Sequence, residues 1–343
     1  MRFAFDDEQL RFRYSVRGVL ERICPPAAVR AAWDDGGACD PARWRALAEL
    51  GVLGLLVPER AGGLGLDELA LVLALEETGR AALPDPVIDA VAVAAPLLAG
   101  LDDRGFADPW LNRLASGTAV VTVGAPPNPW VSHADAAELL LLAAGDELHA
   151  VPKAATRATR LPHLDGAQRF FRVEWTPTDT TRIAHGVAAR ALITAAADRG
   201  ALAAAAQLLG TAQRLIEEAV GYARQREQFG RPIGSFQAIK HMLASAQVKL
   251  EFARPVVYRA AFGVARVLPT RSRDVSHAKV AAADAAALAA RTALQVHGAI
   301  GYTWEVDLHV WMKRAWALEA AWGTSTWHRA RLAALLLDDA ESP

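Results

Sequence analysis

A long segment rich in alanine and leucine, in the second half of the chain, constrains the fold more than any other feature. Residues 198–224 contain no proline, and the interior Gly210 costs only about 1 kcal/mol against a favourable helical pattern. The turn Phe229-Gly230-Arg231-Pro232 then breaks this pattern, and helical sequence resumes at once. Long helices with short connections predict an antiparallel four-helix bundle. Its other helices are predicted over residues 232–266, 272–296 and 324–337.

The first part of the chain is predicted to be helical as well. Apolar residues recur at helical spacing from Phe12 to Ile23, and Pro25-Pro26 end this segment. Asp40 and Asp67 are suited to cap two further helices, which are expected to stop near residues 51 and 78. We therefore expect an N-terminal helical domain over residues 1–111.

The middle of the chain carries short apolar or alternating segments, separated by Pro, Asn, Gly and Asp, which are typical of strands. They span residues 119–123, 139–143, 147–151 and 170–175, and Gly145-Asp146 is typical of a hairpin turn between two of them. The pattern predicts a small β-domain over residues 112–182 and a C-terminal helical bundle over residues 183–343. The expected fold class is mostly α with a small central β-domain.

Composition excludes several classes of function. The 343 residues carry a formal net charge of −1, so there is no large basic field to attract nucleic acid or acidic lipid. The longest apolar runs, such as residues 139–144, are too short to span a bilayer. Cys24 and Cys39 make neither a disulfide framework nor a metal site. We expect a cytoplasmic protein without a metal, and without a nucleic-acid or membrane partner.

Two motifs resemble those of a known enzyme family. Residues 225–241, QREQFGRPIGSFQAIKH, resemble the signature turn of the acyl-CoA dehydrogenases, flavoenzymes that desaturate acyl-CoA thioesters. Residues 295–302, QVHGAIGY, resemble the family's second motif, a Gln followed by a glycine-rich bend. The resemblance covers the whole chain and implies the same order of helical domain, β-domain and four-helix bundle. The FAD contacts that it implies are Arg226, Phe229, Gln237, Gln295, Gly298 and Ala299.

The chemistry of these residues suits FAD, and in relatives the same residues contact the FAD of a neighbouring subunit. A guanidinium such as that of Arg226 suits a diphosphate, because it is planar, always charged and able to bind two oxygens at once. Small residues in the second motif let the backbone approach FAD closely, although Ala299 stands where the family usually has glycine. In homo-oligomeric relatives the same residues reach across the dimer interface to the FAD of the neighbouring subunit.

The chain departs from the family where a subunit holds its own flavin. The family has a Thr-Glu-Pro stretch and then a Gly-Ser-Asp turn in the β-domain. Residues 121–129 read VTVGAPPNP here, and no Gly-Ser-Asp turn follows them. The resemblance therefore implies that the chain's own flavin cradle is absent or degraded.

The catalytic base of the family is missing as well. Most relatives place a Glu just before Gly-Thr, about twenty residues beyond the second motif, and this chain has Trp322 before Gly323-Thr324. An indole has one N–H donor and no basic lone pair, so no catalytic residue is assigned. Two carboxylates remain as alternative bases. Asp198 is equally suited to cap a helix, and Glu319 would face away from the flavin in the family geometry.

Loss of both features in one chain is simple to explain in a hetero-oligomer. A sister subunit carries FAD and the Glu, and this chain completes that site. The leading hypothesis is the non-catalytic subunit of an α2β2 acyl-CoA dehydrogenase, similar to the actinobacterial enzymes that act on steroid side-chain CoA thioesters. Two alternatives stay open: an active homo-oligomer that uses Asp198 or Glu319, and a non-enzymatic scaffold of the same fold.

Overall fold

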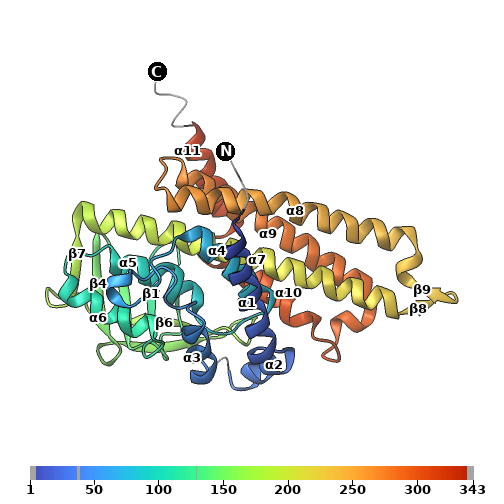
Figure 1. Ribbon diagram of the computed structural model, residues 1–343, viewed down its shortest axis with the longest axis horizontal. Helices are drawn as coiled ribbons and strands as arrows, with labels where there is room; N and C mark the ends of the chain where they lie inside the picture. Colours follow the sequence, from blue (N-terminus) through green and yellow to red (C-terminus); the bar gives the residue numbers. More distant parts are fainter. Residues whose placement is uncertain (1–4, 37–38, 129, 338–343) are drawn as a thin grey trace.

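The computed structural model describes residues 5–36, 39–128 and 130–337, and its elements follow the predicted order (Figure 1). Helices come first, strands lie in the middle of the chain, and long helices form the rest. In Figure 1 the strands from the middle of the chain lie toward one end of the long axis, and the long helices extend to the other end. The fold class, mostly α with a small β region, is confirmed.

The N-terminal helices confirm the two predicted caps. An Asp40 carboxylate oxygen accepts the Ala42 N–H at 2.8 Å, and one of Asp67 accepts the Leu69 N–H at 3.0 Å. The sequence pattern does not predict the second helix, because Pro25-Pro26 indicates only the end of a helix. In the structure α1 ends at Ile23, and Pro26 is the first residue of α2. The helical elements are α1 (Asp7–Ile23), α2 (Pro26–Asp34), α3 (Pro41–Glu49), α4 (Glu68–Arg80), a π-helical segment (Ile88–Ala94), α5 (Ala95–Ala99) and α6 (Arg104–Ala115).

The strands from the middle of the chain form two small sheets. One has the order β1-β3-β4-β7, with β1 and β3 parallel and the other pairs antiparallel, and the second has the order β2-β6-β5. Gly145, with φ +61°, turns the chain between β3 and β4 as expected. The strands are β1 (Val121–Gly124), β2 (Val131–Ser132), β3 (Leu139–Ala144), β4 (Glu147–Pro152), β5 (Arg157–Leu161), β6 (Phe170–Glu174) and β7 (Arg182–His185).

Three of these strands lack a sequence signal. β2 has two residues, and β5 and β7 are short and carry arginines rather than apolar alternation. The domain limits near residues 111 and 182 stay a prediction; α6 continues to Ala115, and β7 begins at Arg182.

The C-terminal helices pack as a bundle. α7, α8 and α9 lie against one another, α10 packs against both α7 and α9, and α11 packs on α9. The sequence pattern predicts the fourth helix at 324–337, which is α11, and does not predict α10. It also starts α8 too early, because Pro232 belongs to a short strand. The helices are α7 (Gly186–Gln225), α8 (Gln237–Ala265), α9 (Arg271–His297), α10 (Leu308–Ala320) and α11 (Ser325–Leu337).

Two glycines let α4 cross α7 backbone against backbone. A Cβ added to Gly210 of α7 would lie 1.8 Å from the Glu76 carbonyl oxygen, and one added to Gly79 of α4 would lie 2.1 Å from the Gln207 carbonyl oxygen. The Thr211 hydroxyl also donates to the Gly79 carbonyl at 3.2 Å. The N-terminal helices are therefore fixed to the bundle at a contact with no room for a side chain.

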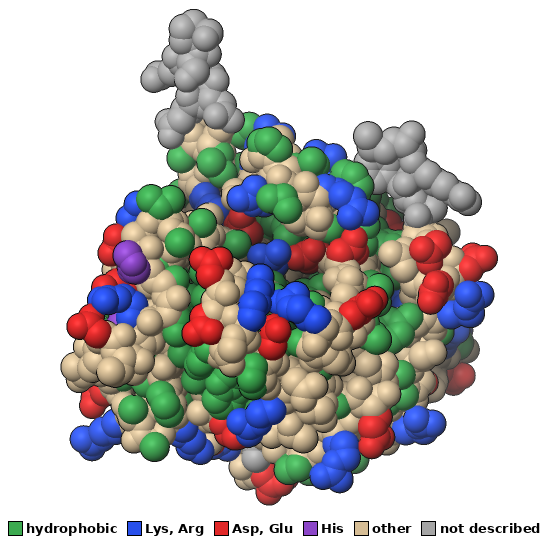
Figure 2. Space-filling model, turned by 60° about the vertical axis from the view of Figure 1, so that its left-hand side comes forward, with side chains coloured by type: hydrophobic (Ala, Val, Ile, Leu, Met, Phe, Trp, Pro, Cys, Tyr) green, Lys and Arg blue, Asp and Glu red, His purple; other side chains and the backbone are tan. Residues whose placement is uncertain are grey.

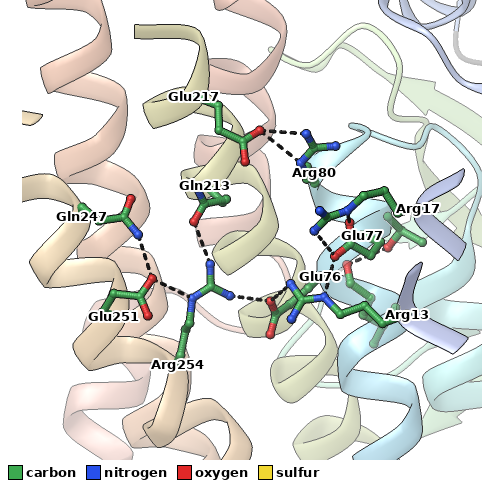
Figure 3. Close-up of polar contacts among 12 residues, drawn as sticks. Arg13, Arg17, Glu76, Glu77, Arg80, Gln213, Glu217, Gln247, Glu251 and Arg254 are labelled. Carbon is green, nitrogen blue, oxygen red and sulfur yellow. Dashed lines mark hydrogen bonds and ion pairs between the residues drawn. The ribbon is translucent and has the colours of Figure 1, made fainter. Parts of the chain in front are cut away.

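A buried ionic network surrounds this crossing (Figure 3). Glu76 on α4 contacts Arg13 of α1 at 3.0 Å and Arg254 of α8 at 2.6 Å, and Glu77 contacts Arg17 of α1 at 2.8 Å. Burial acts to raise the pKa of Glu77, but hydrogen bonds from Arg17 and Arg13 hold it below its ordinary value. The network joins three helices from distant parts of the sequence.

The surface carries no strong charge of one sign on the face shown in Figure 2. Basic and acidic side chains are interspersed there with hydrophobic ones. Within the described ranges, no helix is both long enough and apolar enough to cross a membrane.

The glycine crossing predicts a stability effect. Replacing Gly210 by Ala forces α4 and α7 apart, so we expect Gly210→Ala to lower the free energy of unfolding by about 3 kcal/mol or more. Gly221 is a matched control in the same helix, because its Cβ would meet nothing within 4 Å. Gly221→Ala should raise stability by about 0.5–1 kcal/mol through helix propensity. Urea unfolding measures both, and equal effects of the two changes would contradict the crossing.

Candidate functional site

The first motif forms a hairpin that projects from the end of the bundle (Figure 1). Strands β8 (Glu227–Gln228) and β9 (Arg231–Pro232) pair antiparallel, and Phe229-Gly230 is the two-residue turn between them. Both turn residues have positive φ, +54° and +76°, which is the geometry of a type I′ turn. The left-handed region costs a residue with a Cβ about 1–2 kcal/mol, and Phe229 is also 92% exposed. Packing within this chain gives no reason for an aromatic residue there.

The other polar and aromatic groups of this hairpin face solvent beside Phe229. Arg226 follows the last residue of α7, is exposed, and has no ion-pair partner among the residues that the structure describes. The Arg231 guanidinium lies 4.2 Å from the centre of the Phe236 ring, and the Phe229 ring meets Phe236 edge-on at 6.1 Å. Gln237, the first residue of α8, is exposed as well.

The second motif lies at the end of α9. His297 is the last residue of that helix, and Gly298 turns the chain with φ +63° and ψ −140°, a conformation that favours glycine. A short 3₁₀ turn, Gly298–Tyr302, follows. Gln295 and Ala299 are exposed.

A stacked pair of rings brings the two motifs together. The Tyr222 ring of α7 lies on the His297 ring with 4.4 Å between centroids and 22° between planes. The Tyr222 carbonyl accepts the Arg226 N–H at 2.8 Å, so the stack lies one turn from that residue. The six residues predicted to contact FAD therefore gather at one end of the bundle, where α7 and α9 end and α8 begins.

Trp322 lies elsewhere, in the turn between α10 and α11. It is 1% exposed, and its φ is +55°. Its indole packs on α7 at Gly200, where an added Cβ would lie 2.2 Å from the ring. Its backbone N–H donates to the Asn128 side-chain oxygen at 3.3 Å. Asn128 belongs to the stretch 121–129, whose last residue, Pro129, lies outside the described residues.

The space beside Trp322 is a small cavity of about 30 Å³ with both polar and apolar lining residues. Asp89, Asn128, Ser132 and Arg314 are among its lining residues. Pockets that enclose drug-sized ligands measure about 300–1,000 Å³. A cavity one tenth of that size has room for a few waters and none for a flavin ring.

Asp89 is a candidate that sequence reasoning missed. It is buried on the π-helical segment, and burial raises the pKa of its carboxyl to about 7, against hydrogen bonds from Ser132 and Trp322 that act to lower it. A titrating carboxyl in a cavity is a common feature of functional sites. The available signal was a single acid within the apolar run 87–95.

The two carboxylates proposed as bases have structural partners. Asp198 lies inside α7, so the helix-cap interpretation is wrong, because that helix begins at Gly186. It accepts a hydrogen bond from the Ser272 hydroxyl at 2.6 Å and pairs with Arg331 at 2.7 Å. Glu319 accepts the Ser325 N–H at 2.8 Å and so caps α11. Neither lines the cavity beside Trp322.

The buried Asp89 predicts a pH effect on stability. Its pKa is about 7 in the folded state and 3.8 as an ordinary carboxyl, so between these values the folded state keeps a proton that the unfolded state releases. The free energy of unfolding should therefore fall as pH rises through this window. Asp89→Asn removes the effect and should be more stable than the unaltered chain at pH 8, by on the order of 4 kcal/mol, but not at pH 4. Urea titrations at both pH values measure the difference; a pH-independent difference would contradict it.

Comparison with known proteins places the whole chain in one family. Residues 6–118 match the N-terminal domain of acyl-CoA dehydrogenases, and residues 190–337 match the C-terminal domain. The acyl-CoA dehydrogenase IpdE2 of Mycobacterium tuberculosis is 33% identical over 315 residues, which are 90% of this chain and 91% of the relative. IpdE2 of Mycolicibacterium smegmatis is 33% identical over 310 residues, 90% of this chain and 92% of the relative.

Solved structures agree with this placement. A chain of the ChsE4-ChsE5 complex from Mycobacterium tuberculosis matches with a TM-score of 0.86 and 25% identity. The match covers 100% of this chain and 100% of the matched chain. A glutaryl-coenzyme A dehydrogenase in complex with glutaryl-CoA matches with a TM-score of 0.88 and 24% identity, over 98% of this chain and 97% of the other. With two IpdE2 relatives matched over nine tenths of their length, the chain belongs to the acyl-CoA dehydrogenase family.

Proposed function

We propose that this chain is the non-catalytic subunit of a heteromeric, FAD-dependent acyl-CoA dehydrogenase. In the complex it contributes contacts to the FAD of a sister subunit, and that sister subunit supplies the Glu that removes the proton α to the thioester. When bound, FAD accepts a hydride from the β carbon of the acyl-CoA substrate. The observation that carries the proposal is the burial of Trp322 where the resemblance implies the base.

The chain's own pocket supports a non-catalytic role. Trp322 presents an N–H donor and no basic atom, and its indole is packed between α7 and the cavity wall. The remaining space of about 30 Å³ cannot hold an isoalloxazine ring and a thioester together. Opening it requires the buried indole to leave a site shaped by Gly200.

The six residues of the two motifs fit the outer half of FAD. The exposed guanidinium of Arg226 suits the anionic diphosphate, and the exposed ring of Phe229 offers a face to the adenosine half. The left-handed backbone at Gly298 allows close approach of the chain. Gln237, Gln295 and Ala299 complete this surface, which we call the FAD arm.

The distance between the two places favours a shared cofactor. Gly200, beside Trp322, and Arg226 are 26 residues apart (226 − 200) on or at the end of α7. At 1.5 Å per residue they are about 39 Å apart along the helix. A cofactor bound by the FAD arm lies far from this chain's own cavity, so it serves another subunit's site.

Relatives support the heteromeric and steroid parts of the proposal. The matched ChsE4-ChsE5 assembly is a complex of two different chains, and a matched Tcur3481-Tcur3483 protein is described as a steroid acyl-CoA dehydrogenase. By analogy we propose an α2β2 heterotetramer in the cytoplasm, with a role in lipid metabolism and steroid degradation and with a bulky acyl-CoA as substrate.

An active chain with an unusual base is the second candidate, and one observation favours it. Asp89 lines the cavity beside Trp322 with a pKa near 7, as a general base would require. Asp198 and Glu319 are weaker choices because each already stabilises a helix junction. A scaffold without FAD is the third candidate. The exposed and strained Phe229 weighs against it, since a scaffold has no use for that conformation.

Arg226 tests the FAD arm directly. We expect Arg226→Ala, in the complex with the sister subunit, to weaken FAD binding about 10–150-fold, because a charge-assisted hydrogen bond contributes about 1.5–3 kcal/mol. Arg224→Ala is the matched control, since it removes an equal charge from an exposed site two residues earlier. Flavin absorbance after dialysis measures the FAD content of each complex.

Three results, obtained with the complex and with this chain alone, separate the candidates. Equal FAD retention in Arg226→Ala and Arg224→Ala would contradict the FAD arm. A yellow, active preparation of this chain alone, inactivated by Asp89→Asn, would support the unusual base. A stable complex without any FAD would support the scaffold.

Phe229 separates FAD binding from stability. Glycine accepts positive φ without the Cβ penalty, so we expect Phe229→Gly to leave the thermal midpoint unchanged or slightly higher. The same change removes the exposed ring and should lower the FAD content of the complex. Unchanged FAD content in a folded Phe229→Gly complex would argue that the ring does not contact the cofactor.

A further inference from the structure

The turn that carries Trp322 holds two consecutive residues in left-handed backbone. Trp322 has φ +55° and Gly323 has φ +98°. Such a conformation persists in a bulky residue only where the surroundings fix it, and it is typical of switch regions and ligand clamps. The contacts that fix this turn therefore decide where the indole of Trp322 lies.

Buried polar groups of α9 and α11 hold the turn. Lys279 of α9 donates from Nζ to the carbonyl oxygens of Glu319 and Gly323, both at 2.8 Å. His328 of α11 lies with Nε2 3.0 Å from the Trp322 carbonyl oxygen. A carbonyl cannot donate, so this nitrogen carries the proton, and the Ser276 hydroxyl donates to Nδ1 across 3.2 Å.

Lys279 has the environment of a neutral amine. It is fully buried, and among the described residues its Nζ contacts two carbonyl oxygens and forms no ion pair. A neutral amine has two N–H donors, and both are used by the two carbonyls. An ammonium group carries a third N–H, which would need a third acceptor. Among the described residues, Nζ hydrogen-bonds only to these two carbonyls. Consistent with this, burial lowers the pKa of Lys279 to about 7, although Glu319 acts to raise it.

We propose that Lys279 is a positioning residue for Trp322: as a neutral amine it clamps the turn so that the indole seals the cavity beside Asp89, and protonation of the amine loosens that seal. The inference concerns this chain's own pocket and holds whether or not FAD is shared with a sister subunit.

The charged groups around Lys279 determine what protonation of its amine would do. His328 is kept neutral, because burial first and Lys279 second lower its pKa to about 4. Arg331 of α11 is neutralised by Asp198 of α7, and the Glu319 carboxylate is held by the Ser325 N–H. An ammonium at Lys279 would therefore face a second basic group without an anion in contact. Asp89, on the cavity side of the indole, is the other group that titrates near pH 7.

The state of Trp322 can be followed by fluorine NMR of the whole chain labelled with 5-fluorotryptophan. Trp322→Phe assigns the resonance. In the unaltered chain we expect this resonance to titrate with a midpoint near pH 7, and its solvent isotope shift to grow below that pH as the indole becomes accessible. Because Asp89 also has a pKa near 7 and accepts a hydrogen bond from Trp322, Lys279 is tested in the Asp89→Asn background. Asp89→Asn alone should retain the titration. Adding Lys279→Met, which keeps the length and lacks the proton, should abolish it.

Each outcome of this experiment either supports or overturns the proposal. A Trp322 resonance that does not change between pH 6 and pH 9 overturns the proposal. So does a titration that disappears in Asp89→Asn, or one that survives when Lys279→Met is added to Asp89→Asn. The comparison of the unaltered chain with Asp89→Asn decides even where Lys279→Met does not fold. None of these measurements depends on flavin content, so a failure here is distinct from a failure of the shared-FAD proposal.

Discussion

The contact of α4 with α7 at Gly79 and Gly210 is the constraint on which the rest of the structure depends. It allows two backbones to touch, which places Glu76 and Glu77 between cations of α1 and α8. Breaking a buried ionic network of this kind costs several kcal/mol, because the remaining charges stay out of water. The crossing and the network together fix the N-terminal helices to the bundle.

α7 then connects the two places that matter for function. Near its first third, Gly200 makes room for the indole of Trp322. At its far end, Tyr222 stacks on His297 and brings the two FAD motifs together. This helix of 40 residues keeps the small cavity and the exposed arm far apart. That separation supports the proposed division of roles between two subunits.

The sequence predicted the elements whose signals are local. Asp40 and Asp67 indicate helix starts, because an N-cap side chain accepts hydrogen bonds only from the backbone N–H groups of the next few residues. Hairpin geometry at Gly145 is local as well. The sequence pattern did not predict α10, because its apolar residues show no simple helical period. These residues, which include Trp311 and Met312, pack against both α7 and α9. The pattern did not predict β5, because an exposed strand lacks the apolar alternation that marks a buried one.

By itself, the sequence determined the family, the order of the helical and β parts, and the two motifs that resemble FAD contacts, since all three depend on residue types at fixed spacing along the chain. Only the tertiary structure decided that Trp322 is buried beside a small cavity, that Asp89 also lines this cavity, and that Lys279 and His328 hold the turn of Trp322. Those residues come from elements far apart in sequence, and their charge states depend on burial. Burial is a property of the packed molecule, so no local pattern can report it.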